Sequence, residues 1–106
     1  MALARIQLPE RIKRGDLVEV RIVIQHPMET GFRLDAWSHR IARNAIHSFA
    51  CRYNGVEVFR ATLGTGIAAN PYLRFFTRAL DSGELELWWL DDDEVEGTAR
   101  AKIVVL

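Results

Sequence analysis

Residues 49–59 read Phe-Ala-Cys-Arg-Tyr-Asn-Gly-Val-Glu-Val-Phe, and the rest of the chain can be understood from this segment. Two runs rich in β-branched and aromatic residues flank Asn54-Gly55. A type I′ turn needs positive φ at both central residues, which asparagine tolerates and glycine adopts freely. The segment therefore predicts a β-hairpin with a two-residue loop.

The two-residue loop also predicts the register of the hairpin. Each residue before the turn should pair with the residue at the same distance after it, and alternate residues should share a face. Cys51 is then predicted to point inward, while the Arg52/Glu57 pair marks the more exposed face. The predicted pairs are Tyr53–Val56, Arg52–Glu57, Cys51–Val58 and Ala50–Phe59, with Phe49, Cys51, Tyr53, Val56 and Val58 on one face and Ala50 and Phe59 on the other.

The composition is that of one globular domain spanning residues 1–106, because 49% of the residues are hydrophobic and 26% are charged. Fourteen Lys and Arg balance fourteen Asp and Glu, and no basic cluster extends beyond Arg11–Arg14. No nucleic-acid partner is predicted. Residues 1–9 have no signal-peptide pattern and no apolar run could span a bilayer, so no membrane contact is predicted and the residues alone indicate a cytoplasmic protein.

Apolar and polar residues alternate along most of the chain, which predicts about seven β-strands with turns at regular spacing. The pattern predicts an immunoglobulin-like antiparallel β-sandwich, with a small closed barrel as the alternative. Residues 32–45 carry the weakest signal and are predicted as a loop or partial hairpin, with a short helical turn at 38–42 as the alternative. The predicted strands are residues 4–8, 16–24, 46–53, 56–59, 72–79, 85–90 and 99–105.

No residue pattern in the chain predicts catalysis, a metal or a cofactor. His26, His39 and His47 are the only histidines, and they lack metal-ligand spacing. An iron site of the superoxide reductase kind would need several histidines and an outward cysteine thiolate. The acidic run 91–94 lacks the glycine and distal glutamate of a calcium loop, so a solvated turn is predicted there.

Cys51 is the single cysteine, so no intrachain disulfide can form. A nucleophilic cysteine needs a lowered pKa in a partly exposed place, whereas Cys51 is predicted to be a small core residue. A thiol enzyme that uses Cys51 remains an alternative, as does a stand-alone ligand-binding or adhesion module. Trp88 and Phe76 on outer faces and Trp37 in a loop indicate a surface that a partner covers.

Four motifs together resemble one family: His26-Pro27-Met28-Glu29-Thr30-Gly31-Phe32-Arg33, Phe49-x-Cys51-x-Tyr53-Asn54-Gly55-x-Glu57-Val58-Phe59, Ala69-Asn70-Pro71-Tyr72 and Asp91-Asp92. On these residues the chain is similar, over nearly its whole length, to the SoxZ family. SoxZ is the smaller subunit of the bacterial sulfur-oxidation carrier complex. Ala42 departs from the family, which often has proline there, and this bears only on the rigidity of that loop.

The resemblance implies an immunoglobulin-like fold and a heterodimer with SoxY. The C-terminal Gly-Gly-Cys-Gly-Gly segment of SoxY carries the sulfur intermediates of thiosulfate oxidation as covalent adducts. This chain ends in strand-like residues 102–106, so the carrier cysteine is expected on the partner and this chain is expected to be a non-catalytic scaffold. Family membership also implies a periplasmic location, reached by export together with SoxY, in place of the cytoplasmic prediction.

Residues 26–31 and 70–72 are the predicted partner-binding surface. They are expected to contact SoxY, or to present its C-terminal segment to the cytochrome and hydrolase enzymes of the pathway. The alternative is that Pro27, Gly31 and Pro71 only shape turns. The predicted partner-binding residues are His26, Met28, Glu29, Thr30, Asn70 and Tyr72.

Overall fold

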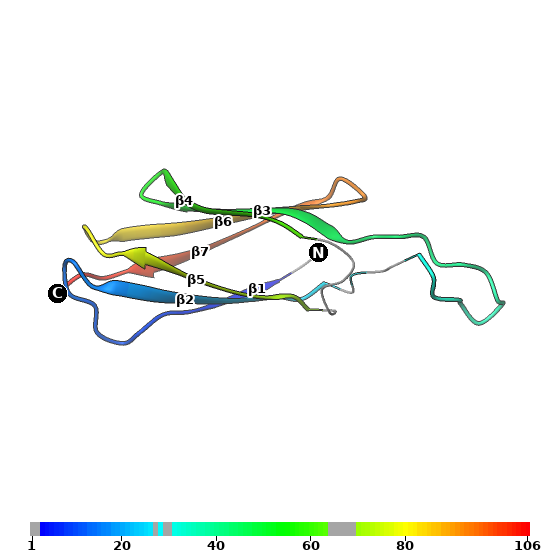
Figure 1. Ribbon diagram of the computed structural model, residues 1–106, viewed down its shortest axis with the longest axis horizontal. Coiled ribbons are helices and arrows are strands. Elements are labelled where there is room, and N and C mark those ends of the chain that lie inside the picture. Colours follow the sequence, from blue (N-terminus) through cyan, green and yellow to red (C-terminus); the bar gives the residue numbers. More distant parts are fainter. Residues whose placement is uncertain (1–2, 27, 29–30, 64–69) are drawn as a thin grey trace.

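The chain forms a β-sandwich in the computed structural model, which describes residues 3–26, 28, 31–63 and 70–106 (Figure 1). One sheet has the order β1-β2-β5 and the other has the order β4-β3-β6-β7. Two separate antiparallel sheets confirm the predicted sandwich and exclude the closed barrel. The strands are β1 (Ala4–Gln7), β2 (Leu17–Ile24), β3 (Ile46–Tyr53), β4 (Val56–Thr62), β5 (Tyr72–Arg78), β6 (Gly83–Asp91) and β7 (Glu96–Ile103).

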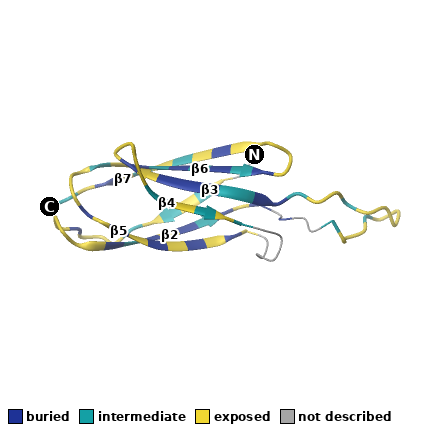
Figure 2. Cartoon of the chain, turned by 45° about the horizontal axis from the view of Figure 1, so that its top comes forward, coloured by how far each residue is buried: buried dark blue, intermediate teal, exposed yellow. Residues whose placement is uncertain are grey.

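The core lies between the two sheets, because alternate residues of each strand turn inward (Figure 2). The inward residues of β2 are Val18, Val20, Ile22 and Ile24, and those of β6 are Leu85, Leu87 and Trp89. The described part of the chain has no helix, and so none that is long and apolar enough to cross a membrane. The fully buried large side chains are Trp89, Phe49, Ile22, Ile24, Ile46, Leu85, Leu87, Ile103, Val18, Val20, Pro71 and Cys51.

The β3–β4 hairpin has the predicted turn, with φ of 49° at Asn54 and 83° at Gly55. The predicted Tyr53–Val56 and Arg52–Glu57 pairs are confirmed. Beyond them the predicted register is wrong. The strands shift at a β-bulge, so that Cys51 pairs with Phe59 and Ala50 pairs with Arg60.

Packing between the sheets explains the bulge. The bulge turns Phe59 inward. There the Phe59 ring stacks on the ring of Phe75 in β5, at a centroid distance of 4.4 Å and an interplanar angle of 2°. Phe59 was predicted to lie on the outer face, and Val56 was predicted to lie inside although 66% of it is exposed. An aromatic contact between the sheets thus overrides the register that the turn alone would set.

Residues 31–45 form a projecting hairpin that extends beyond the end of the sandwich (Figure 1). Leu34 and Arg40 make an antiparallel bridge, and Asp35 N–H donates to His39 O at 2.8 Å. The predicted partial hairpin is therefore confirmed, and the predicted strand start near Ile46 is confirmed. The helical turn at 38–42 is wrong. The molecule measures 56 × 21 × 20 Å along its principal axes.

Candidate functional site

The structure brings three of the predicted partner-binding residues together where the projecting hairpin begins. His26 and Met28 follow β2, and Asn70 precedes β5. Tyr72 opens β5 and is 53% exposed. Glu29 and Thr30 lie outside the described residues, so the prediction for them stays a prediction.

His26 and Met28 are buried, at 6% and 4% exposed, so these two side chains do not lie on the surface of the isolated chain. The backbone N–H of Met28 donates to His26 Nδ1 at 3.1 Å. Since Nδ1 accepts this bond, the ring proton sits on Nε2, which lies 3.1 Å from Asp91 Oδ2 and donates to it. His26 is therefore held as the Nε2–H tautomer against a buried carboxylate.

Asn70 joins the same cluster through the backbone of His26. The backbone N–H of His26 donates to Asn70 Oδ1 at 3.0 Å, and Asn70 N–H donates to His26 O at 2.7 Å. Asn70 has φ of 56°, which asparagine tolerates better than most residues. We call His26, Met28, Asn70 and Asp91 the junction, because they tie together loops that are far apart in the sequence.

Asp91 is the residue of the junction that was not among the predicted partner-binding residues. It was placed in a solvated acidic turn, but only 5% of it is exposed. Its Oδ1 accepts the N–H groups of Asp93 at 2.9 Å and Val95 at 3.0 Å. Desolvation raises the pKa of Asp91, but the hydrogen bonds from Val95, His26 and Asp93 outweigh it and hold that pKa below its ordinary value.

The junction also holds the base of the projecting hairpin. Ala45 N–H donates to Asp92 Oδ2 at 3.1 Å, and Asp92 N–H donates to Ala45 O at 3.0 Å. Arg43 Nε pairs with the same Asp92 oxygen at 3.1 Å. The N–H of Ile46 points to Met28 Sδ at 3.2 Å. The β6–β7 turn and the loop after β2 therefore set where the hairpin leaves the sandwich.

Most of the projecting hairpin is exposed to solvent, as its colour in Figure 2 shows, and its large apolar residues are among the exposed ones. Phe32, Leu34 and Trp37 are 79%, 56% and 77% exposed. Asp35 orders the tip, because its Oδ1 accepts the N–H groups of Trp37 at 2.8 Å and His39 at 2.9 Å. An ordered hairpin that exposes three large apolar residues is typical of a surface that another protein covers. Sequence reasoning identified Trp37 only.

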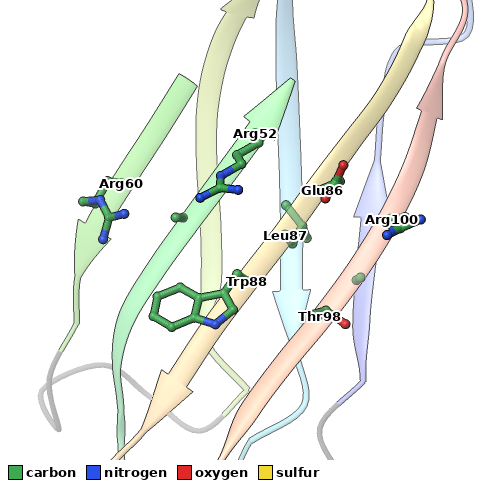
Figure 3. A pocket seen from close by; sticks show the side chains of 9 residues that line it. Arg52, Arg60, Glu86, Leu87, Trp88, Thr98 and Arg100 are labelled. Carbon is green, nitrogen blue, oxygen red and sulfur yellow. The ribbon is translucent and has the colours of Figure 1, made fainter. Parts of the chain in front are cut away.

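A second feature is a hollow of about 390 Å³ on the outer face of the four-stranded sheet (Figure 3). Ala50 lies in its floor, because its short side chain leaves space between Trp88 and Arg60. Arg52 and Arg100 line the same hollow with Glu86 between them in the sheet register. The hollow is therefore mainly cationic, with one indole at its rim.

Cys51 lies on the opposite face of β3, inside the sandwich. It is fully buried, which confirms the predicted inward orientation, and desolvation raises the pKa of its thiol to about 12. A thiolate is the nucleophilic form of cysteine. Burial and a raised pKa both act against covalent chemistry at this position.

We expect the native protein to react with iodoacetamide far more slowly than the unfolded protein. Raising the pKa of Cys51 from 9.0 to about 12 leaves about a thousandfold less thiolate near neutral pH, and burial adds a steric barrier. Mass spectrometry of alkylation over time, in buffer and in denaturant, measures both rates. Equal rates in the two conditions would contradict this prediction and would support the alternative of a thiol enzyme that uses Cys51.

Comparisons with known proteins agree on the fold and identify one family. The model of the family described as the sulphur oxidation protein SoxZ matches residues 6–102. No curated protein matches the chain significantly. Among the described residues, no group of three or more His, Cys, Asp or Glu side chains could hold a metal ion.

Several solved structures are similar to this chain. A superoxide reductase (neelaredoxin) from Ignicoccus hospitalis is 22% identical, with a TM-score of 0.72. The match covers 97% of this chain and 80% of the reductase chain. A putative superoxide reductase from Thermotoga maritima is 16% identical, with a TM-score of 0.71, and the match covers 97% of this chain and 85% of that one. A hypothetical protein from Pyrococcus horikoshii is 15% identical, with a TM-score of 0.65, and the match covers 95% of this chain and 87% of that one. At these identities the likeness shows the fold alone.

Proposed function

Because this chain belongs to the SoxZ family of sulphur oxidation proteins, we propose that it is the non-catalytic subunit of a sulfur carrier complex. Its partner is a SoxY-like subunit, whose C-terminal cysteine carries the sulfur intermediates of thiosulfate oxidation. The family match over residues 6–102 is the observation that carries this proposal. The buried Cys51 supports it, since a thiol inside the sandwich is poorly placed to exchange sulfur with an enzyme.

The projecting hairpin is the part of this chain that we assign to the SoxY-like partner. Its exposed Phe32, Leu34 and Trp37 supply apolar area, and Trp is enriched among the residues that dominate binding energy at interfaces. The predicted residues Asn70 and Tyr72 are exposed near the base of the hairpin. The buried His26 and Met28 contribute by positioning the hairpin instead of by direct contact.

Co-expression with a partner that ends in Gly-Gly-Cys-Gly-Gly tests the proposed function. We expect the two chains to co-purify as a heterodimer, and thiosulfate turnover by the pathway's cytochrome and hydrolase enzymes to require both. A stand-alone binding or adhesion module would purify alone in the same experiment. Turnover of a sulfur compound by this chain alone would overturn the non-catalytic assignment.

Trp37→Ser is expected to weaken capture of the SoxY-like partner about 30-fold, since an exposed indole at a protein interface typically contributes about 2 kcal/mol. The stability of the isolated chain should change by less than about 0.5 kcal/mol, because 77% of Trp37 is exposed. Titration calorimetry measures the affinity. The matched control is Ala36→Ser, an exposed neighbour on the same turn, which should leave the affinity unchanged. An unchanged affinity in Trp37→Ser would remove the hairpin from the interface.

A periplasmic location, reached by co-export with the partner, completes the proposal. Fractionation of cells that express this chain with and without the SoxY-like subunit tests it. We expect the chain in the periplasmic fraction only when the partner carries its export signal. A chain that stays in the cytoplasm in both strains would contradict co-export.

A further inference from the structure

The outer face of the four-stranded sheet carries a row of alternating charges. Glu57 pairs with Arg52, Arg52 with Glu86, and Glu86 with Arg100 in the strand register. The row therefore runs negative, positive, negative, positive from β4 across β3 and β6 to β7. Glu57 is already paired with Arg60 of the same strand at 2.7 Å. Within the described part of the chain, no ion pair involves Arg52, Glu86 or Arg100, so these three charges remain available to another surface.

The next row across the same sheet is uneven in height. Arg60, Ala50, Trp88 and Thr98 are neighbours in the strand register. Ala50 leaves the hollow, and Figure 3 shows Trp88 standing beside it on β6. A small residue and a large one thus occupy equivalent places on either side of the line between β3 and β6.

Both rows fit a second copy of this chain, and we propose that the outer face of the four-stranded sheet is a face-to-face homodimer interface. A two-fold axis parallel to the strands, between β3 and β6, lays β3 of one copy over β6 of the other and β4 over β7. This rotation puts Arg52 opposite Glu86 and Glu57 opposite Arg100 of the second copy. An isologous interface requires such self-complementarity.

The same rotation matches the uneven row. It places Trp88 of each copy over Ala50 of the other, so that the two indoles cover the two hollows near the axis. Buried aromatic residues near the centre of an interface carry most of its binding energy. A two-fold axis that crosses the strands along the charged row would instead set each charge of that row opposite itself, and like charges in contact are unfavourable.

The size of the face predicts a weak dimer. Four strands about 4.8 Å apart, with a rise of about 3.3 Å per residue over some seven residues, give a face of roughly 20 by 23 Å. Burying it on both copies removes roughly 1,000 Å² from solvent, which is near the lower limit for a specific interface. We therefore expect a reversible dimer that dissociates at high ionic strength, because exposed ion pairs are screened by salt.

Sedimentation velocity of the purified full chain over a concentration series tests the proposal. We expect a monomer–dimer equilibrium at low salt, and a dissociation constant at least tenfold higher for Trp88→Ala. Thermal unfolding confirms that the variant is folded. A chain that is monomeric at every concentration, or a Trp88→Ala chain that dimerises as well as the wild type, would overturn the proposal.

Charge-reversal variants distinguish contacts between two copies from contacts within one copy. Arg52→Glu and Glu86→Arg should each abolish dimerisation when present alone, because each sets like charges opposite one another. An equimolar mixture of the two variants should form a mixed dimer. In it the new carboxylate at position 52 of one chain faces the new guanidinium at position 86 of the other, and the two unchanged residues form the second opposite-charge pair.

The matched control for charge reversal is Arg5→Glu on the other sheet, which should dimerise normally. A mixture of Arg52→Glu and Glu86→Arg that stays monomeric would overturn the face-to-face arrangement.

The SoxY-like subunit is the competing occupant of this face. If Arg52→Glu leaves the oligomeric state of the isolated chain unchanged and instead weakens capture of that subunit, the face belongs to the heterodimer and the homodimer proposal is wrong. The proposed function stands in that case, because capture of the partner tests it independently.

Discussion

Asp91→Ala is expected to destabilise the protein by about 3 kcal/mol, because it removes one buried acceptor that serves three donors, and each buried donor left without a partner costs about 1–3 kcal/mol. The substitution leaves the backbone N–H groups of Asp93 and Val95 and the Nε2–H of His26 without their acceptor. Buried donors without a partner are costly because they have also lost their water. Denaturant unfolding followed by tryptophan fluorescence measures the change.

The control for this substitution is Asp93→Ala, two residues away in the same turn. The side chain of Asp93 is exposed and accepts no hydrogen bond from the described residues, so its loss should cost less than about 0.5 kcal/mol. Similar losses in the two variants would show that Asp91 contributes only as part of a generic acidic turn.

Acidification should remove the contribution of Asp91 to the free energy of unfolding. The pKa of Asp91 is lowered in the folded protein, so its stabilising effect is present above the ordinary carboxyl pKa and is lost as pH falls through the lowered folded value. Asp91→Asn cannot titrate, so it should lose less stability than the wild type over that acidic range. Parallel pH profiles for the wild type and Asp91→Asn would contradict the assignment.

Gly97→Ala is expected to cost about 3 kcal/mol, because a Cβ at this position would overlap the indole of Trp89. Gly97 pairs with Trp89 across β6 and β7, and Trp89 is only 2% exposed. A rigid buried ring has little room to move, so the strands themselves would have to shift. Thermal and denaturant unfolding measure the loss.

A double-mutant cycle identifies the overlap as the cause. Trp89→Phe alone leaves a cavity and destabilises the core. Combined with Gly97→Ala, the smaller ring makes room for the added methyl group, so the double variant should be more stable than the sum of the single changes predicts. Additive losses would mean that Gly97 matters for its backbone and not for the space over Trp89.

The strand pattern needed no tertiary information. Val18, Val20, Ile22 and Ile24 face inward as their alternation predicts, and the Asn54-Gly55 turn has the positive φ values that these residues favour. These features depend on neighbours along the chain, which the sequence displays directly. The motifs that carry the family resemblance are also short contiguous stretches, so they could be identified without the structure.

The junction and the hollow could not be predicted in the same way. The contact between His26 and Asp91 joins residues 65 positions apart, so the burial of this acidic residue has no signal near it in the sequence. The bulge depends on Phe59 meeting Phe75 of the other sheet. The alignment of Ala50 with Trp88 follows from how β3 and β6 pair.

The order of residues was enough to predict that this chain alternates into an antiparallel sandwich, that its cysteine turns inward and that it belongs with SoxZ. The packed molecule was needed to reveal that His26 is buried against Asp91, that Phe59 turns inward, and that a hairpin with Trp37 at its tip stands clear of the sandwich. The two kinds of feature differ in range. Turn preference and strand periodicity act between residues a few positions apart, whereas burial, register shifts and surface shape depend on which distant strands pack together.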